Sequence, residues 1–205
     1  MTIELTLYLA SQSPRRRELL TQIGISFTPQ AVDIDESIKP DETAEKYVQR
    51  LANEKAVAGL SLLKHQNIAV LGSDTSVVID GEILGKPKND SDAKRMLTLL
   101  SGKSHKVMTA VTLAIKSEEK DEPELTSIVS VSKVTFKKLS NDEIEQYIQS
   151  GEPTDKAGSY AIQGLAAAFI THLSGSYSGV MGLPLYETAE LLRKAGIRAE
   201  SVVVS

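Results

Sequence analysis

The sequence contains no cysteine and no tryptophan, and aromatic residues make up only 4% of its 205 residues. The lack of cysteine excludes disulfide bonds, which fits a reducing compartment, so we expect a cytoplasmic protein. No apolar run approaches the roughly 18 residues that a membrane-spanning helix requires, and the first residues lack the basic segment of a signal peptide. The formal net charge of −4 gives no general attraction to nucleic acid or anionic lipid. We therefore expect neither a membrane nor nucleic acid among its partners.

The hydrophobic residues, 41% of the sequence, can form a core, and their spacing alternates between the periods of strands and helices. This alternation predicts an α/β fold. No repeat or linker interrupts it, so we predict one domain over residues 1–205. Strands are expected around 5–9 and at 26–32, 68–80, 105–115, 127–139, 166–172 and 197–204, with a hairpin turn at Asp80-Gly81 and a loop at 117–124. Helices are expected at 14–23, 41–60, 90–100, 141–149 and 183–194.

Residues 7–20 pass from strand to helix, and the first helical turn carries the basic run Arg15–Arg17. Ser13 suits the N-cap and Pro14 the first helical position. Arginines conflict with this end of a helix, because its partial positive charge favours acidic side chains. A bound phosphate would explain the arginines, because helix N-termini and guanidinium groups both bind phosphate. The alternative is a solvated basic turn without a ligand, and the residues leave both interpretations open. The run is also typical of nucleic-acid-binding arms, but no basic stripe accompanies it.

An acidic group around Glu36 and the single acidic residue Asp74 are candidates for a site. Glu36 follows Asp33 and Asp35, and such oxygen ligands suit Mg²⁺ or Mn²⁺, although a hydrated loop would have the same spacing. Asp74 falls in the apolar strand predicted at 68–80. A buried carboxylate is costly unless it is paired or binds a metal, so Asp74 is either a functional residue or half of a structural ion pair.

Three further polar residues have both a functional and a structural interpretation. Lys55 lies on the apolar stripe of the helix predicted at 41–60, where a lysine either extends its stem to solvent or points into a site. Lys86 lies in the segment 81–87, whose glycine spacing and proline exclude a Walker A loop, but it can contact phosphate as a point charge. Gln163 follows a glycine-containing loop and can hydrogen-bond a planar polar edge; ordinary turn glycines are the alternative. The histidines show no metal-ligand spacing.

Taken together, these residues resemble the Maf family of nucleoside triphosphate pyrophosphatases. The resemblance runs in order along nearly the whole chain, and only its first motif is specific by itself. One departure is Gly179, where members often carry asparagine, which affects only local loop geometry. The matching motifs are Leu9–Arg16, Asp35-Glu36, Ala52–Lys55, Gly72–Thr75, Gly85–Pro87, Ser101-Gly102 with His105, Thr109–Val111, Asp155–Gly158, Ile162–Gly164 and Gly182–Pro184.

The resemblance implies a fold and a reaction. The fold is the α/β type shared with inosine-triphosphate pyrophosphatases, a mixed twisted sheet with flanking helices and two lobes around a cleft, commonly as a homodimer. The reaction converts a nucleoside triphosphate and water into a monophosphate and pyrophosphate with a divalent cation, Mg²⁺ or Mn²⁺. The matching functional positions are Ser11, Arg15, Arg16, Glu36, Lys55, Asp74 and Lys86.

The same resemblance implies roles for these residues. The arginines and lysines would hold the triphosphate, Glu36 and Asp74 would hold the metal, and Asp74 would accept the proton of the attacking water. Arg15, Thr75 and Gln163 match the specificity positions of the branch that acts on dTTP and UTP, rather than the branch that acts on 7-methyl-GTP. A modified nucleotide as substrate, or a non-catalytic nucleotide-binding regulator of cell division, remain the alternatives.

Overall fold

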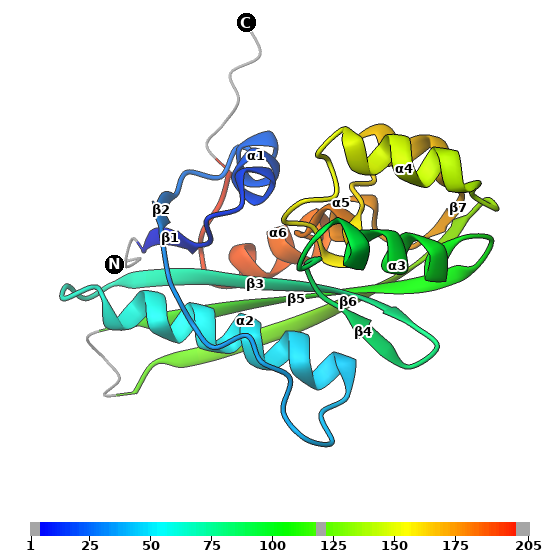
Figure 1. Cartoon of the computed structure of the whole chain (residues 1–205). Helices are drawn as coiled ribbons and strands as arrows, with labels where there is room; N and C mark the ends of the chain where they lie inside the picture. The colour runs from blue at the N-terminus through cyan, green and yellow to red at the C-terminus, as the bar shows by residue number, and fades with distance from the viewer. Residues whose placement is uncertain (1–4, 118–121, 200–205) are drawn as a thin grey trace, which may run out of the picture. The chain divides into compact units, whose positions relative to one another are not determined.

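The structure is a computed structural model that describes residues 5–117 and 122–199 (Figure 1). Its strands are β1 (Thr6–Ala10), β2 (Thr28–Gln30), β3 (Ile68–Ile79), β4 (Glu82–Leu84), β5 (Ser104–Lys116), β6 (Glu124–Phe136) and β7 (Ile170–Ser174). Its α-helices are α1 (Pro14–Gln22), α2 (Ala44–Ser61), α3 (Asp90–Leu100), α4 (Asn141–Gln149), α5 (Tyr177–Met181) and α6 (Leu185–Lys194), and two short 3₁₀ helices are η1 (Ala157–Ser159) and η2 (Leu165–Phe169).

The strands of these described ranges form one seven-stranded sheet in the order β2-β1-β3-β5-β6-β7, with β4 paired to β3. β1 is parallel to β2 and β3, whereas β4 is antiparallel to β3 and β7 is antiparallel to β6. The predicted α/β fold with a mixed sheet and flanking helices is therefore confirmed.

Helix starts follow the capping chemistry of the sequence. The Asn89 side chain caps α3 by accepting a hydrogen bond from the Asp92 amide at 2.9 Å. At α4, Ser140 and Glu143 form a reciprocal capping box. These caps satisfy amide groups that have no partner inside the helix. As a result α3 and α4 have the bounds predicted from the sequence.

The hairpin predicted at Asp80-Gly81 is also confirmed. Asp80 has a φ of 50° and Gly81 a φ of 85°, the pair of positive values that a tight two-residue turn requires. The turn joins β3 to β4, and Ile79 pairs with Glu82 across it.

Four predicted strands need correction. The strand expected at 127–139 is β6, which ends at Phe136. The strand expected at 166–172 is wrong over its first half, where η2 replaces it before β7 begins at Ile170. Only Thr28–Gln30 of the segment 26–32 forms a strand. Of the last expected strand, residues 197–199 are irregular and residues 200–204 lie outside the described part. The loop predicted at 117–124 ends one residue earlier, at the start of β6, and its residues 118–121 also lie outside the description.

The chain divides into two compact units, and β3, β5 and β6 contribute residues to both. The first unit comprises Met1–Asp74, Thr109–Val129 and Gly182–Ser205. Within it α2 lies on one side of the strands and α6 on the other (Figure 1). Small and branched side chains of β1, α2, β3 and β5 form a core cluster in it, namely Ala10, Ala56, Leu60, Ile68, Val70 and Ala114.

The second unit comprises Thr75–Met108 and Ser130–Met181. Its core concentrates aromatic residues that are rare in the sequence: Phe136, Tyr147, Tyr160 and Phe169 pack there edge to face. His105 joins this cluster, and its Nε2 lies 2.8 Å from the hydroxyl of Tyr160. In neither unit is a described helix both long and apolar enough to cross a membrane.

Candidate functional site

Helix α2 approaches β3 closely at Gly72. A Cβ at this position would lie 2.3 Å from the carbonyl oxygen of Ala52 and 2.7 Å from the amide of Ala56. Only glycine lets the two backbones come this close. Asp74 lies two residues further along β3 and therefore on the same face of the strand. The approach brings Lys55 of α2 within reach of that carboxylate.

The ammonium group of Lys55 binds two carboxylates. Its Nζ lies 2.7 Å from Oδ1 of Asp74 and 2.7 Å from Oε1 of Glu36. The side chains of Lys55 and Asp74 are 12% and 11% exposed, whereas that of Glu36 is 44% exposed. The lysine stem thus packs between α2 and the sheet, and its charge ends at an opening where Glu36 meets solvent.

The environment of Asp74 favours its protonated form. Burial raises the pKa of this carboxyl, and the positive charges of Lys55 and Arg16 oppose that effect without cancelling it. A carboxylate with a raised pKa binds a proton more readily than one in water. The raised pKa therefore makes Asp74 a stronger general base than an ordinary aspartate.

A second arm of the site begins where β1 ends. Ala10 pairs with Gly72 in the parallel register, so the chain after β1 emerges beside the chain that leads to Asp74. Arg16, in the first turn of α1, donates from Nε to the carbonyl oxygen of Gly182 at 2.8 Å and from Nη1 to Oγ of Ser11 at 3.4 Å. These bonds fix the guanidinium just beyond the carboxyl end of β1, beside the middle of β3 where Asp74 lies.

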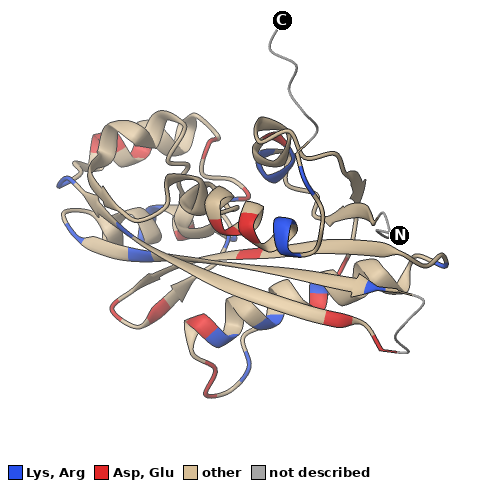
Figure 2. Cartoon of the chain, turned by 180° about the vertical axis from the view of Figure 1, so that it is seen from behind, with Lys and Arg blue, Asp and Glu red and all other residues tan. Residues whose placement is uncertain are grey.

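The start of α1 keeps the unusual character seen in the sequence. Its first turn contains no acidic residue, and the Ser13 side chain makes no capping bond; instead its amide donates to Oγ of Ser11 at 3.1 Å. Burial lowers the pKa of the Arg16 guanidinium, and the positive charge of the adjacent Arg15 lowers it further. The negative charges of Asp74 and Glu36 act in the opposite direction and raise it. Both charge signs occur along the helices, whereas the middles of the long strands carry few charges (Figure 2). The arginines are therefore part of a local site and not of a general basic surface.

The donor set of this site is compatible with a divalent cation. Glu36 and Asp74 already converge on one cationic group, the ammonium of Lys55. The residues described contain no group of three or more acidic, histidine or cysteine side chains that could hold a metal. Two carboxylates, with water and phosphate oxygens as further ligands, suit Mg²⁺. The cluster suggested for Asp33, Asp35 and Glu36 is therefore not found among the described residues. Asp35 accepts a hydrogen bond from the Ser37 amide at 2.9 Å, which lowers the pKa of Asp35.

Three predicted site residues belong to the second unit. Thr75 follows Asp74 in β3 and is half-buried. Lys86 is exposed in the chain after β4, next to Gly85, whose carbonyl oxygen accepts a hydrogen bond from Gly158 at 3.0 Å. Gln163 is exposed just before η2. The structure brings Ser11, Arg16, Glu36, Lys55 and Asp74 together within the first unit, while the roles of Thr75, Lys86, Gln163 and Arg15 stay predictions.

Two side chains that contribute to the geometry, those of Ser73 and Tyr47, were not assigned a role from the sequence. Ser73 donates to the carbonyl oxygen of Gly182 at 3.1 Å, the same oxygen that Arg16 contacts. Tyr47 donates from its hydroxyl to the carbonyl oxygen of Glu36 at 2.8 Å. Glycine inside an apolar strand was a usable signal for the close approach at Gly72, but no local pattern reveals that Gly182 receives two hydrogen bonds.

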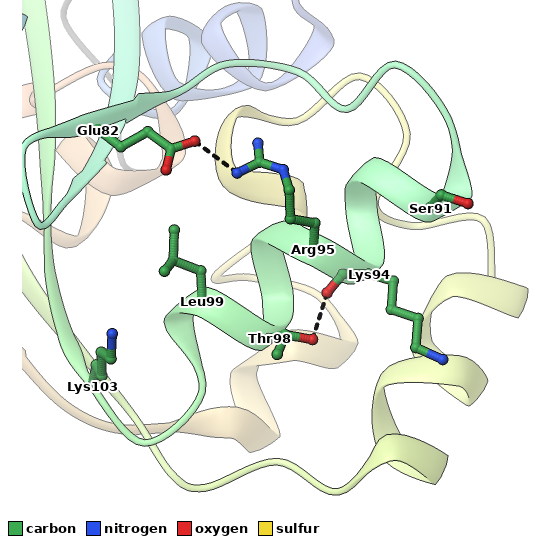
Figure 3. Close-up of a pocket in the computed structure, with 7 residues that line it drawn as sticks. All are labelled: Glu82, Ser91, Lys94, Arg95, Thr98, Leu99 and Lys103. Atoms are coloured by element: carbon green, nitrogen blue, oxygen red, sulfur yellow. Dashed lines mark hydrogen bonds and ion pairs between the residues drawn. The ribbon is translucent and has the colours of Figure 1, made fainter.

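A hollow of about 500 Å³ in the second unit contains none of the predicted site residues (Figure 3). Its cationic side chains are Lys94, Arg95 and Lys103, and each lies within 3.0 Å of a carboxylate. Figure 3 shows one of these pairs, in which Arg95 contacts Glu82. Because the cations are already neutralised, this hollow is not a candidate phosphate site.

The fold and site define an α/β protein in which acidic and basic side chains pair beside the strands β1 and β3. A family model described as Maf-like protein matches residues 6–195. A dTTP/UTP pyrophosphatase of Pseudoalteromonas atlantica is 55% identical over 196 residues, covering 95% of this chain and 99% of the relative. The chain therefore belongs to the Maf family.

Further relatives extend this comparison. A dTTP/UTP pyrophosphatase of Photobacterium profundum is 56% identical over 187 residues, which cover 89% of this chain and 92% of the relative. A dTTP/UTP pyrophosphatase of Bordetella avium is 52% identical over 198 residues, which cover 93% of this chain and 96% of the relative. Among solved structures, the Staphylococcus aureus Ham1 protein is similar at 12% identity and a TM-score of 0.43, covering 80% of this chain and 90% of that one.

Proposed function

We propose that the protein hydrolyses dTTP and UTP to the corresponding monophosphate and pyrophosphate. Relatives that are 52–56% identical over most of the chain carry the name dTTP/UTP pyrophosphatase. The observation that carries the proposal is the position of the Lys55 ammonium between Glu36 and Asp74. A site with a buried carboxylate of raised pKa beside two cationic side chains suits hydrolysis of a phosphoanhydride better than simple binding.

In the proposed reaction, water attacks the α-phosphorus of the nucleotide. The bond between the α-phosphorus and the bridging oxygen breaks, and pyrophosphate leaves with the electron pair. Asp74 accepts the proton of the attacking water, a role for which its raised pKa is suited. Arg16 and Lys55 neutralise the charge that develops on the pyrophosphate, and we assign Arg15 and Lys86 to the same task.

We include a divalent cation, Mg²⁺ or Mn²⁺, in the proposal. Glu36 and Asp74 would hold it, and Lys55 would then turn from the carboxylates to the phosphates. A divalent cation at this position supplies charge neutralisation for the phosphate oxygens. The convergence of the two carboxylates on Lys55 supports this part of the proposal, since these oxygens already share one cationic partner.

Pyrimidine selection is assigned to Arg15, Thr75 and Gln163. The amide of Gln163 can donate to and accept from the edge of a uracil or thymine ring. A site built to hydrogen-bond one edge rejects bases that leave its polar groups without partners. The exposed position of Gln163 leaves its amide accessible to a base.

A panel of nucleotides tests the function. Purified protein is incubated with Mg²⁺ or Mn²⁺ and with dTTP, UTP, CTP, dATP, dGTP or 7-methyl-GTP, and pyrophosphate and orthophosphate are measured separately. We expect pyrophosphate from dTTP and UTP and little from the others. Release only from a purine nucleotide would overturn the substrate assignment, and orthophosphate as first product would overturn the assignment of the cleaved bond. Binding without any turnover would instead favour a regulator.

The remaining parts of the proposal concern assembly and location. We propose a homodimer, which light scattering would detect as twice the 22.2 kDa mass of the chain. A monomer at micromolar concentration would contradict it. A cytoplasmic location, for which the absence of cysteine is the support, is tested by cell fractionation.

A further inference from the structure

Glu36 reaches Lys55 from a stretch of chain that has no helix or strand. Residues 31–43 are irregular, and the Glu36 side chain is 44% exposed. Holding an exposed side chain in one geometry costs conformational entropy, and an irregular backbone adds to that cost. The short contact with Lys55 therefore requires that something else fix the backbone at Glu36.

Two side chains of α2 hold this backbone. The hydroxyl of Tyr47 donates to the carbonyl oxygen of Glu36 at 2.8 Å, and Nη2 of Arg50 donates to the carbonyl oxygen of Ser37 at 2.9 Å. Burial raises the pKa of Tyr47 to about 12, so its hydroxyl stays protonated and remains a donor. Lys55 is on the same helix, so one rigid element carries both the target of Glu36 and the groups that fix it.

Arg50 is itself rigidly placed. It binds Glu42 through two bonds, from Nε at 2.6 Å and from Nη2 at 2.8 Å, and it contacts Glu54 from Nη1 at 3.2 Å. Its guanidinium also lies over the ring of Tyr47, 5.5 Å from the ring centroid. The hydrogen bond from Arg50 is the main reason that the pKa of Glu42 falls to about 2. The planar guanidinium of Arg50 thus connects both ends of residues 37–42 to α2. The ammonium group of a lysine cannot make the same set of hydrogen bonds.

We propose that Tyr47 and Arg50 are positioning residues that hold the Glu36 carboxylate against Lys55 and so set its effectiveness in the reaction. This inference rests on the proposed catalytic role of Glu36. Neither side chain has to touch the substrate for this, because both act on the backbone that carries Glu36. Their contribution to turnover must therefore disappear when Glu36 no longer has a carboxylate.

The test combines hydrogen–deuterium exchange with a double-mutant cycle. Exchange of the amides in residues 36–42 is compared in the wild type, Tyr47→Phe and Arg50→Lys, without nucleotide. Turnover of dTTP is measured for the same substitutions, alone and combined with Glu36→Gln. Arg95→Lys is the matched control, because Arg95 also lies on a helix and pairs with two carboxylates, those of Asp92 and Glu82, but belongs to the second unit, whereas residues 36–42 belong to the first.

We expect Arg50→Lys to speed exchange in residues 36–42 and to lower kcat by about tenfold, the scale of one lost charged hydrogen bond. Tyr47→Phe should act in the same direction by a smaller factor. In the Glu36→Gln background both substitutions should change kcat by less than about twofold, because the interaction that they support is already gone. Arg95→Lys should change neither readout.

Two results would overturn the inference: unchanged exchange in residues 36–42, or equal losses of kcat with and without the Glu36 carboxylate. If the wild type released no pyrophosphate from any nucleotide, the proposed function would fail together with the catalytic role of Glu36. The exchange measurement would still decide whether Tyr47 and Arg50 hold this segment. The two failures are therefore distinguishable.

Discussion

Replacing Lys55 with methionine removes the ammonium group between two carboxylates and keeps a side chain of similar length. The Asp74 residue as a whole is 8% exposed, so its carboxylate would remain buried without its nearest cation. Removing one partner of a buried ion pair typically costs 3–5 kcal/mol. Because Arg16 still acts on Asp74, we expect the lower end of this range, a loss of about 3 kcal/mol in the free energy of unfolding at about pH 7.

The measurement is urea unfolding followed by circular dichroism, since the chain has no tryptophan to report by fluorescence. Loss of the ammonium raises the pKa of Asp74 further. When the pKa of a carboxyl is higher in the folded state than in the unfolded state, the folded protein becomes more stable as the pH falls. The deficit of Lys55→Met should therefore shrink between about pH 7 and about pH 5, and Asp74→Asn in the same chain should restore most of it. Equal stability of wild type and Lys55→Met, or a deficit that Asp74→Asn leaves unchanged, would refute the reasoning.

Three further predictions follow from other contacts. Arg16→Ala should lower turnover by about 100-fold or more, as expected for a group that stabilises charge in the transition state, whereas Arg17→Ala should stay within about twofold; equal effects would contradict this division. Burial lowers the pKa of His105 to about 4. The folded state therefore resists protonation of His105, and about 3 kcal/mol of the free energy of unfolding should be lost as the pH falls from about 6.5 to about 4. Urea unfolding of wild type and His105→Asn at several pH values measures this loss. An equal dependence of the unfolding free energy on pH in both proteins would contradict the prediction. A Cβ on Gly164 would lie 2.4 Å from the carboxylate of Glu152, so Gly164→Ala should lower the melting temperature by several degrees, and an unchanged melting curve would show that the carboxylate can move away.

The elements with strong local signals were predictable from the sequence. α3 and the hairpin after β3 have the expected bounds because caps and turn residues act over a few positions. The strand expected at 166–172 failed because a distant group decides the local structure. Glu152 accepts hydrogen bonds from the amides of Leu165 and Ala166 at 2.9 and 3.4 Å, and these bonds hold the start of η2. α5 was missed because five residues are too few to show a helical period.

Some of the grouped side chains stood out singly in the sequence, but their arrangement did not. A lysine on an apolar stripe and an acid in an apolar strand were each visible as misfits, and the structure joins Lys55 to Asp74 at 2.7 Å. The pairing depends on how closely α2 approaches β3 at Gly72. A glycine inside an apolar strand indicates such an approach, but it does not identify α2 as the element that makes it. The support of Glu36 by Tyr47 and Arg50 was also hidden, because an arginine on the surface of a helix usually means only solvent contact.

The central claim is that Asp74 activates water for attack on a nucleoside triphosphate, and the most direct test compares wild type with Asp74→Asn in parallel assays of turnover and nucleotide binding. We predict that wild type releases pyrophosphate from dTTP and UTP, and that Asp74→Asn is slower by about 1,000-fold, the scale of a lost general base, while it still binds the nucleotide. A variant that turns over dTTP at the wild-type rate would contradict the account.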